Sequence, residues 1–217
     1  MARVVFDLDG TLVDSARDLQ AVANDLLHPL GLAAVTLDEV RSFVGLGVAV
    51  FITRMRAARG IADSCQADLV TGFMARYDTA FGLTTVYPGV AQTLAELQQA
   101  GHRLGLCTNK PLAPTLALLR HLGLAGVFVK VIAGDSLPTR KPDPAPLRAA
   151  FDMGGAGPDL FVGDSEVDAE TAARADVPFL LFTRGYRATP VSDMPHTVAF
   201  DDFNALPGLI AQMSKGV

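Results

Sequence analysis

The chain has 217 residues, with 18 Lys and Arg against 23 Asp and Glu, so its formal net charge is -5. This charge excludes a protein that binds nucleic acid through a strongly basic surface, and we expect no nucleic-acid partner. Half of the residues are hydrophobic and only 19% are charged, which excludes an intrinsically disordered chain. No segment reaches the roughly 20 apolar residues of a membrane span, so we expect no membrane partner.

The N-terminus does not resemble a secretion signal, because Asp7 interrupts the short apolar run of residues 4–6. We therefore expect a cytoplasmic protein. The two cysteines, Cys65 and Cys107, match neither a disulfide framework nor a zinc-binding spacing. We expect both to be buried free thiols.

Short apolar runs alternate with amphipathic segments of helical length, which is typical of a parallel sheet with crossover helices. The predicted strands are residues 3–7, 102–107, 129–133, 160–163, 178–182 and, at an edge, 197–200. The predicted helices between them are residues 90–100, 113–122, 144–151 and 167–174. This order predicts an α/β fold whose Rossmann-like core is a doubly wound parallel sheet.

One segment breaks this alternation. Residues 15–83 contain no convincing strand and show helical spacing of apolar residues, first near Leu19 and again over 48–59 and 69–77. Such a segment is too long for a crossover and too helical for a loop. We predict an α-helical cap domain over residues 15–83, inserted into a catalytic core of residues 1–14 and 84–217.

Polar residues gather at the carboxyl ends of the predicted strands, where open parallel sheets bind their ligands. These residues are Asp7, Asp9, Thr108, Asn109, Lys141, Asp164 and Asp168. We expect them to lie along one edge of the sheet.

The first two of these residues predict phosphoryl chemistry. Asp7 and Asp9 lie two positions apart on an extended segment, so both carboxylates face the same point. Like charges at this separation favour one anionic and one protonated group. An anionic nucleophile beside a neutral acid can attack a phosphorus atom and protonate the leaving oxygen.

The remaining residues supply charge balance and neutral donors. Asp164 adds another carboxylate, and a hard divalent cation such as Mg²⁺ would stabilise the acidic cluster. Together, Mg²⁺ and Lys141 would neutralise most of the charge of the carboxylates and a bound phosphate. Thr108 and Asn109 offer uncharged donors to phosphoryl oxygens. Gly10 allows the chain to turn sharply beside the ligand.

Several other residues have simpler structural interpretations. Asp14 and Ser15 precede a predicted helix and fit N-cap positions. Arg54, Arg56 and Arg59 fit a solvent-exposed helix face.

These motifs resemble those of the haloacid dehalogenase-like superfamily of phosphohydrolases. The resemblance covers nearly the whole chain and includes a helical cap that follows the first motif. The four similar segments, in chain order, are DLDGTLVDS at 7–15, Thr108-Asn109, Lys141-Pro142 and GDSEVD at 163–168.

The resemblance implies a role for each site residue. Asp7 would be the nucleophile that forms an aspartyl-phosphate, and Asp9 the acid and base. Thr108 and Asn109 would bind phosphate, while Lys141 would orient and neutralise it.

The resemblance also implies a metal site. Mg²⁺ would be held by the Asp7 carboxylate, the backbone carbonyl of Asp9, and Asp164, with Asp168 supporting that set. From the residues alone, Asp168 equally fits a favourable negative charge at the N-terminus of a helix.

Within the superfamily, the chain most resembles bacterial phosphoglycolate phosphatases. Residues 40–47, VRSFVGLG, are similar to a glycine-bearing cap segment that lies over the active site in that family. Gly45 and Gly47 would then contact the substrate, 2-phosphoglycolate. The chain departs from the family pattern at Asp176, where glycine is usual. We expect a left-handed residue after a helix at this position, a conformation that Asp tolerates.

Other functions stay open at this point. A sugar-phosphate phosphatase or a phosphomutase of the same superfamily would need the same residues. A receiver-type signalling module also combines Asp, Thr and Lys with Mg²⁺, but an inserted cap and a second carboxylate at Asp9 argue against it. Arg41 is a candidate ligand for a substrate carboxylate, although a surface position at the cap hinge fits it better. We expect a small phosphorylated substrate and a monomer or homodimer.

Overall fold

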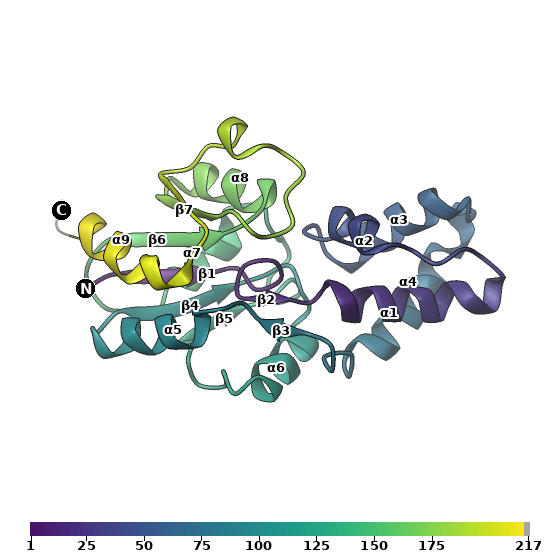
Figure 1. The fold of residues 1–217 in the computed structure, drawn as a ribbon, viewed down its shortest axis with the longest axis horizontal. Coiled ribbons are helices and arrows are strands. Elements are labelled where there is room, and N and C mark those ends of the chain that lie inside the picture. The colour runs from purple at the N-terminus through teal and green to yellow at the C-terminus, as the bar shows by residue number, and fades with distance from the viewer. Residues whose placement is uncertain (215–217) are drawn as a thin grey trace.

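The structure is a computed structural model that describes residues 1–214. It is elongated, with an α/β unit at one end and a group of helices at the other (Figure 1). Six strands form one sheet in the order β5-β4-β1-β6-β7-β8, and all neighbouring strands are parallel. This sheet confirms the predicted doubly wound α/β fold.

Every predicted strand is present, with its bounds shifted by one residue at one end or at both. The strands are β1 (Arg3–Phe6), β4 (Arg103–Cys107), β5 (Lys130–Ile132), β6 (Asp159–Gly163), β7 (Phe179–Phe182) and β8 (Val198–Phe200). The last of these lies at the edge of the sheet, as predicted.

Helices cover both faces of the sheet (Figure 1). Successive side chains of a strand point to opposite faces, so Val4 and Phe6 of β1 pack into one hydrophobic cluster and Val5 into another. The first cluster includes side chains of α5 (Val90–Gln99), α6 (Leu112–His121) and α9 (Leu206–Met213). The second includes those of α7 (Ala145–Phe151) and α8 (Glu166–Ala175). Of these helices, only α9 was not predicted.

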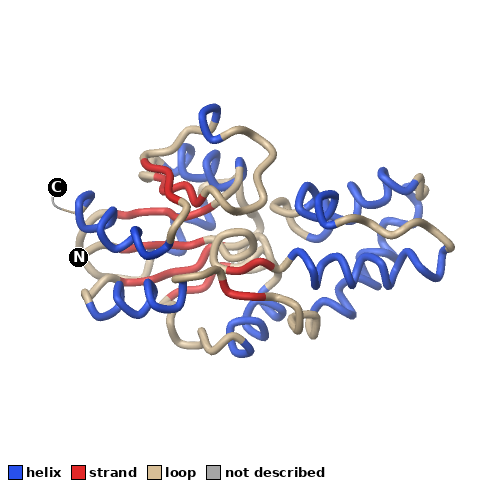
Figure 2. Tube along the Cα trace, viewed as in Figure 1, coloured by secondary structure: helices blue, strands red, loops and turns tan. Residues whose placement is uncertain are grey.

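The inserted segment is helical and has a hydrophobic core of its own. Its helices are α1 (Ala16–Leu27), α2 (Leu37–Phe43), α3 (Val48–Arg59) and α4 (Gln66–Tyr77), and Figure 2 shows them apart from the strands. Their buried apolar side chains form a cluster separate from the two that cover the sheet. We call these four helices the cap. The remaining short helices are η1 (His28–Leu30), η2 (Asp63–Cys65), η3 (Val191–Asp193) and η4 (Phe203–Ala205).

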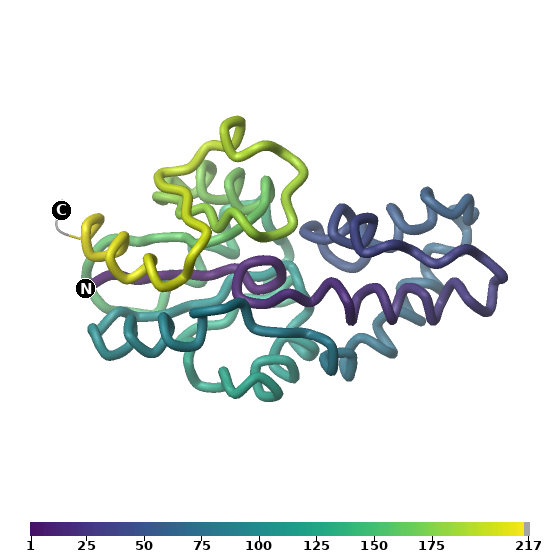
Figure 3. Tube along the Cα trace, in the orientation of Figure 1, coloured from purple at the N-terminus to yellow at the C-terminus, as the bar shows by residue number. Residues whose placement is uncertain are grey.

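Two short strands that were not predicted join the cap to the core. β2 (Val13–Asp14) and β3 (Thr85–Val86) pair antiparallel where the chain leaves the core and where it returns. Figure 3 shows these two connections side by side, one purple and one teal. The pairing brings the two ends of the cap together, and a bridge between Asp9 and Val13 places them beside the segment that follows β1.

The structure corrects the predicted exposed arginine face of α3. Arg56 is buried, because it faces the turn before α4, where its guanidinium donates to Gln66 Oε1 at 2.5 Å and to Asp63 Oδ1 at 2.8 Å. Arg59 donates to both carboxylate oxygens of Glu39, each at 2.8 Å. Both side chains therefore hold the cap helices together.

Two smaller expectations have mixed outcomes. Asp176 ends α8 in the left-handed conformation, with φ 59° and ψ 48°, as predicted. Cys107 is a buried free thiol, but Cys65 is only half-buried, because it lies at the exposed turn between α3 and α4. Within residues 1–214, none of the helices combines the length and apolar composition needed to cross a membrane.

Candidate active site

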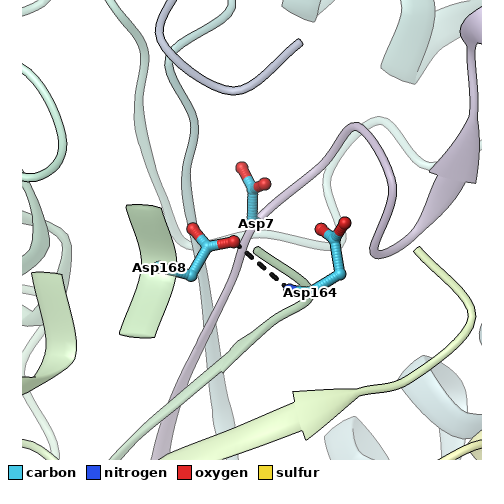
Figure 4. Close-up of side chains that lie close together, drawn as sticks. All are labelled: Asp7, Asp164 and Asp168. Carbon is cyan, nitrogen blue, oxygen red and sulfur yellow. Dashed lines mark hydrogen bonds between the residues drawn. The ribbon is translucent and has the colours of Figure 1, made fainter. Parts of the chain in front are cut away.

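Three buried carboxylates meet at the carboxyl ends of two neighbouring strands. Asp7 directly follows β1 and Asp164 directly follows β6, while Asp168 lies in the first turn of α8. Each offers an oxygen that lies within 4.8 Å of the others (Figure 4). Burial raises the pKa of Asp7 to about 7, and burial together with the other two carboxylates raises that of Asp164. The cluster therefore needs positive charge in order to ionise fully.

Lys141 supplies part of that charge. Its side chain is 2% exposed, and its ammonium lies 2.8 Å from Asp7 Oδ1 and 2.7 Å from Asp168 Oδ1. Burial opposes the charged form, but the attraction of Asp168 and Asp7 holds the pKa of Lys141 above its ordinary value. Lys141 therefore stays protonated between the two carboxylates.

Asp168 has its oxygens occupied by protein groups. Its Oδ1 accepts from Lys141, and its Oδ2 accepts from the backbone N–H groups of Asp164 and Ser165 and from the Ser165 hydroxyl at 2.7 Å. The same contacts form a capping box at the start of α8. Asp168 therefore lies at the start of a helix, as one of its two expected roles requires, and it also contacts Lys141 and the backbone of Asp164.

The two other carboxylates fit a hard cation. Asp164 accepts one hydrogen bond on each oxygen, from the Thr11 hydroxyl at 2.7 Å and from the Tyr186 backbone at 2.6 Å, which leaves lone pairs available. Three buried carboxylates beside a single ammonium leave negative charge to neutralise. Oxygen ligands of this kind are those that Mg²⁺ prefers.

Gly10 keeps space open beside this cluster. Its φ is +90°, and a side-chain Cβ at this position would collide with the Asp164 carboxylate. The structure therefore places Gly10 against Asp164, and the lining of the cavity described below does not include it.

The side chain of Ser15 does not make the N-cap hydrogen bond that the sequence predicted. Ser15 occupies the N-cap position of α1, but its hydroxyl makes no capping hydrogen bond and donates instead to Asp9 Oδ1 at 2.6 Å. Asp14 lies just before the N-cap, and its Oδ1 accepts from the N–H of Ala16, the first residue of α1, at 3.2 Å. That oxygen also accepts from the Tyr186 hydroxyl at 2.5 Å. Tyr186 comes from the loop after β7, which is why sequence spacing gave no indication of it.

A cavity of about 50 Å³ lies between the core and the cap. It brings together seven of the predicted site residues, namely Asp7, Asp9, Gly45, Gly47, Thr108, Asn109 and Lys141. The rest of its lining includes apolar cap side chains, namely Leu19, Val44, Val48, Phe51 and Phe73. Asp164 and Asp168 lie outside this lining.

Asn109 joins the core to the cap. Its amide nitrogen donates to the carbonyl of Gly45 at 2.8 Å and to that of Lys141 at 2.9 Å. The neighbouring Thr108 accepts from the backbone of Lys110 at 3.2 Å, so its hydroxyl hydrogen is available to a ligand. The glycine segment of the cap is therefore held directly over the end of β4.

Sequence reasoning missed Lys110, which also lines the cavity. Its ammonium donates to the Tyr77 hydroxyl at 2.5 Å, lies 4.0 Å from the centre of that ring and lies 3.6 Å from Asp9 Oδ1. Burial lowers the pKa of Lys110. Its position directly after Asn109 could have suggested a place in the site. Its burial could not be predicted, because it depends on contact with the cap helix α4.

Arg41 lies on the surface. Its side chain is 41% exposed and forms ion pairs with Asp14 at 3.7 Å and with Asp38 at 3.5 Å. It is absent from the cavity lining, which agrees with the expectation of a surface arginine at the hinge.

Known proteins resemble the chain along nearly its whole length. Residues 4–182 match the model of a family described as haloacid dehalogenase-like hydrolase. The chain is 48% identical over 216 residues to a phosphoglycolate phosphatase of Cereibacter sphaeroides, covering 98% of this chain and 99% of that one. It is 43% identical over 213 residues to a phosphoglycolate phosphatase of Rhodobacter capsulatus, covering 95% of each. A crystal structure of a predicted phosphoglycolate phosphatase from Haemophilus somnus matches with a TM-score of 0.88 and 30% identity, covering 96% of this chain and 97% of that one.

Proposed function

The chain belongs to the haloacid dehalogenase-like hydrolase family and is a phosphatase, and we propose that it hydrolyses 2-phosphoglycolate to glycolate and phosphate. The observation that carries the proposal is the cavity in which Asp7, Asp9 and Lys141 meet under apolar cap side chains. The cavity combines these charged groups with apolar cap side chains, which suits a small phosphorylated acid. Membership of a hydrolase family decides against a receiver-type signalling module.

Asp7 is the nucleophile in this proposal. Its carboxylate oxygen forms a bond to phosphorus as the bond from phosphorus to the glycolate oxygen breaks, which gives an aspartyl-phosphate. The Lys141 ammonium, 2.8 Å from Asp7 Oδ1, favours the anionic form of the nucleophile and would offset the charge of the phosphoryl oxygens.

Asp9 moves the proton in both halves of the reaction. It donates a proton to the leaving glycolate oxygen and then accepts one from the water that attacks the aspartyl-phosphate. The Ser15 hydroxyl occupies Oδ1 of Asp9, so Oδ2 is free to face the reacting oxygen. Thr108 and Asn109 line the same cavity. The Thr108 hydroxyl would donate to the phosphate, whereas the side-chain amide of Asn109 already donates to two backbone carbonyls.

Mg²⁺ is the proposed cofactor. The Asp7 carboxylate, the Asp9 carbonyl and Asp164 would hold it, and Asp168 would support them. When bound, Mg²⁺ supplies positive charge that offsets the repulsion between the phosphate and the carboxylates.

A substitution in the cap segment tests its contact with substrate. Gly47 has a φ of +85°, and a Cβ there would lie 2.9 Å from Arg140 Nη1 and 3.5 Å from the Asn109 carbonyl. We expect Gly47→Val to raise KM for 2-phosphoglycolate about 10-fold or more without changing the Mg²⁺ concentration that gives half-maximal activity. Gly60→Val is the matched control, because Gly60 also has a positive φ, +65°, but its Cβ would meet nothing within 4 Å. A loss of Mg²⁺ affinity with unchanged KM would contradict this assignment.

A substrate panel tests the proposed function. Phosphate release is measured from 2-phosphoglycolate, glucose phosphates, a nucleoside monophosphate and p-nitrophenyl phosphate, each with Mg²⁺ and with a chelator. We expect a Mg²⁺-dependent kcat/KM for 2-phosphoglycolate at least about 10-fold above the others. Equal turnover across the panel would reject the substrate, and undiminished turnover with chelator would reject the cofactor.

A further inference from the structure

Lys110 is a buried cation in the cavity that the reaction described above does not use. It is 7% exposed, follows Thr108 and Asn109 at the end of β4, and contacts Tyr77 of the cap helix α4. It therefore lies at the junction of the core and the cap, on the wall of the cavity that would hold the substrate.

The charge of Lys110 is less well compensated than that of Lys141. Lys141 lies within 2.8 Å of two carboxylates, whereas the hydrogen-bond partner of the Lys110 ammonium is a neutral hydroxyl, that of Tyr77 at 2.5 Å. Its nearest carboxylate oxygen, Asp9 Oδ1 at 3.6 Å, is beyond hydrogen-bond distance and also accepts from Ser15.

An ammonium group carries three donors, and a buried charge is costly unless it is paired and hydrogen-bonded. The Tyr77 hydroxyl uses one donor of Lys110. The aromatic ring, 4.0 Å from the ammonium, adds attraction but accepts no further strong hydrogen bond. Lys110 thus has donors left for an anion that enters the cavity.

The neighbouring cavity wall restricts which ligand atoms can meet this ammonium. Phe51 and Phe73 of the cap are buried, line the cavity and offer no hydrogen bond to a ligand. A ligand whose phosphate lies at Asp7 and Lys141 and whose second anionic group lies at Lys110 would pair with both buried lysines that line the cavity. A neutral tail would leave the remaining donors of the buried ammonium without a hydrogen-bond partner.

We propose that Lys110 binds the carboxylate of the substrate and thereby selects small phosphorylated acids over phosphate esters with a neutral tail. This inference rests on the proposed phosphatase reaction at Asp7 and deepens it, since it assigns a second anion-binding point to the same cavity. Because Tyr77 belongs to the cap, the carboxylate would be bound where the cap meets the core.

Two substrates that differ only in this group provide the test. In ethyl phosphate, a methyl group replaces the carboxylate of 2-phosphoglycolate. We expect Lys110→Met, which keeps most of the length of the side chain and removes its charge, to lower kcat/KM for 2-phosphoglycolate about 100-fold, mostly through KM. The kcat/KM for ethyl phosphate and the inhibition constant of inorganic phosphate should change less than about 3-fold.

Control variants separate this effect from general damage. Lys130→Met removes a lysine from β5, outside the cavity, and should leave both substrates unaffected. Lys110→Arg keeps the charge and should restore part of the preference. Lys110→Gln replaces Lys110→Met if the latter melts below the assay temperature.

The outcomes distinguish this inference from the proposed function. If the unaltered protein prefers 2-phosphoglycolate and Lys110→Met retains that preference, the substrate stands and the role of Lys110 is wrong. If Lys110→Met loses kcat/KM equally for 2-phosphoglycolate and ethyl phosphate and is inhibited more weakly by phosphate, Lys110 binds the phosphate group and the inference is overturned. If the unaltered protein shows no preference for 2-phosphoglycolate over ethyl phosphate, both the proposed substrate and the proposed role of Lys110 are wrong.

Discussion

Asp7→Asn is expected to lower kcat/KM for 2-phosphoglycolate by at least about 10⁴-fold, because it removes the nucleophile and keeps the shape of the side chain. Stability should be retained. The substitution removes one of three buried carboxylates, and Lys141 keeps its partner Asp168 at 2.7 Å. Phosphate release and thermal melting measure the two effects separately.

Asp25→Asn is the matched control for this variant, since it makes the same change at an exposed position of α1. It should have the activity of the unaltered protein. If Asp7→Asn keeps more than about one hundredth of that activity while Asp25→Asn is normal, Asp7 is not the nucleophile.

Lys141→Met is expected to lower kcat/KM by about 10²- to 10³-fold for every phosphate ester, whatever its tail. The ammonium lies between Asp7 and Asp168, so its loss removes charge that offsets both the nucleophile and the phosphate. This pattern differs from that expected for Lys110→Met, which should affect only substrates with a carboxylate.

The same substitution should also destabilise the protein. Removing one partner of a buried ion pair leaves uncompensated charge, which typically costs about 3–5 kcal/mol. Chemical denaturation, with Lys130→Met as the lysine control outside the cavity, measures this loss. Lys141→Met with a normal free energy of unfolding and kcat/KM within tenfold of normal would contradict both roles assigned to Lys141.

The sequence was sufficient to predict the strands of the sheet and the polar residues at their carboxyl ends. Strands buried on both faces read as apolar runs, and parallel strands end at one edge, so the positions of Asp7, Asp164 and Thr108 followed from chain order. The catalytic roles of these residues and the domain bounds stay predictions, as do the cellular location and the oligomeric state.

Residues whose environment depends on contacts between distant segments could not be predicted. Lys110 is buried because Tyr77 of α4 covers it, and Tyr186 reaches Asp14 from a loop far along the chain. Helical spacing indicated an exposed position for Arg56 because its partners lie beyond the end of α3. Ser15 fits an N-cap by pattern, but the turn of the chain after Asp9 brings that carboxylate within reach of its hydroxyl.

Detection of a phosphoryl group on Asp7 tests the central claim most directly. In Asp9→Asn, p-nitrophenyl phosphate needs no acid to release its leaving group, but the aspartyl-phosphate loses the base that activates water. We therefore expect a rapid release of about one p-nitrophenol per protein. After an acid quench, peptide mass spectrometry should place the phosphate on Asp7. Rapid release with phosphate on another residue, or steady turnover without any phosphorylated peptide, would contradict the proposed mechanism.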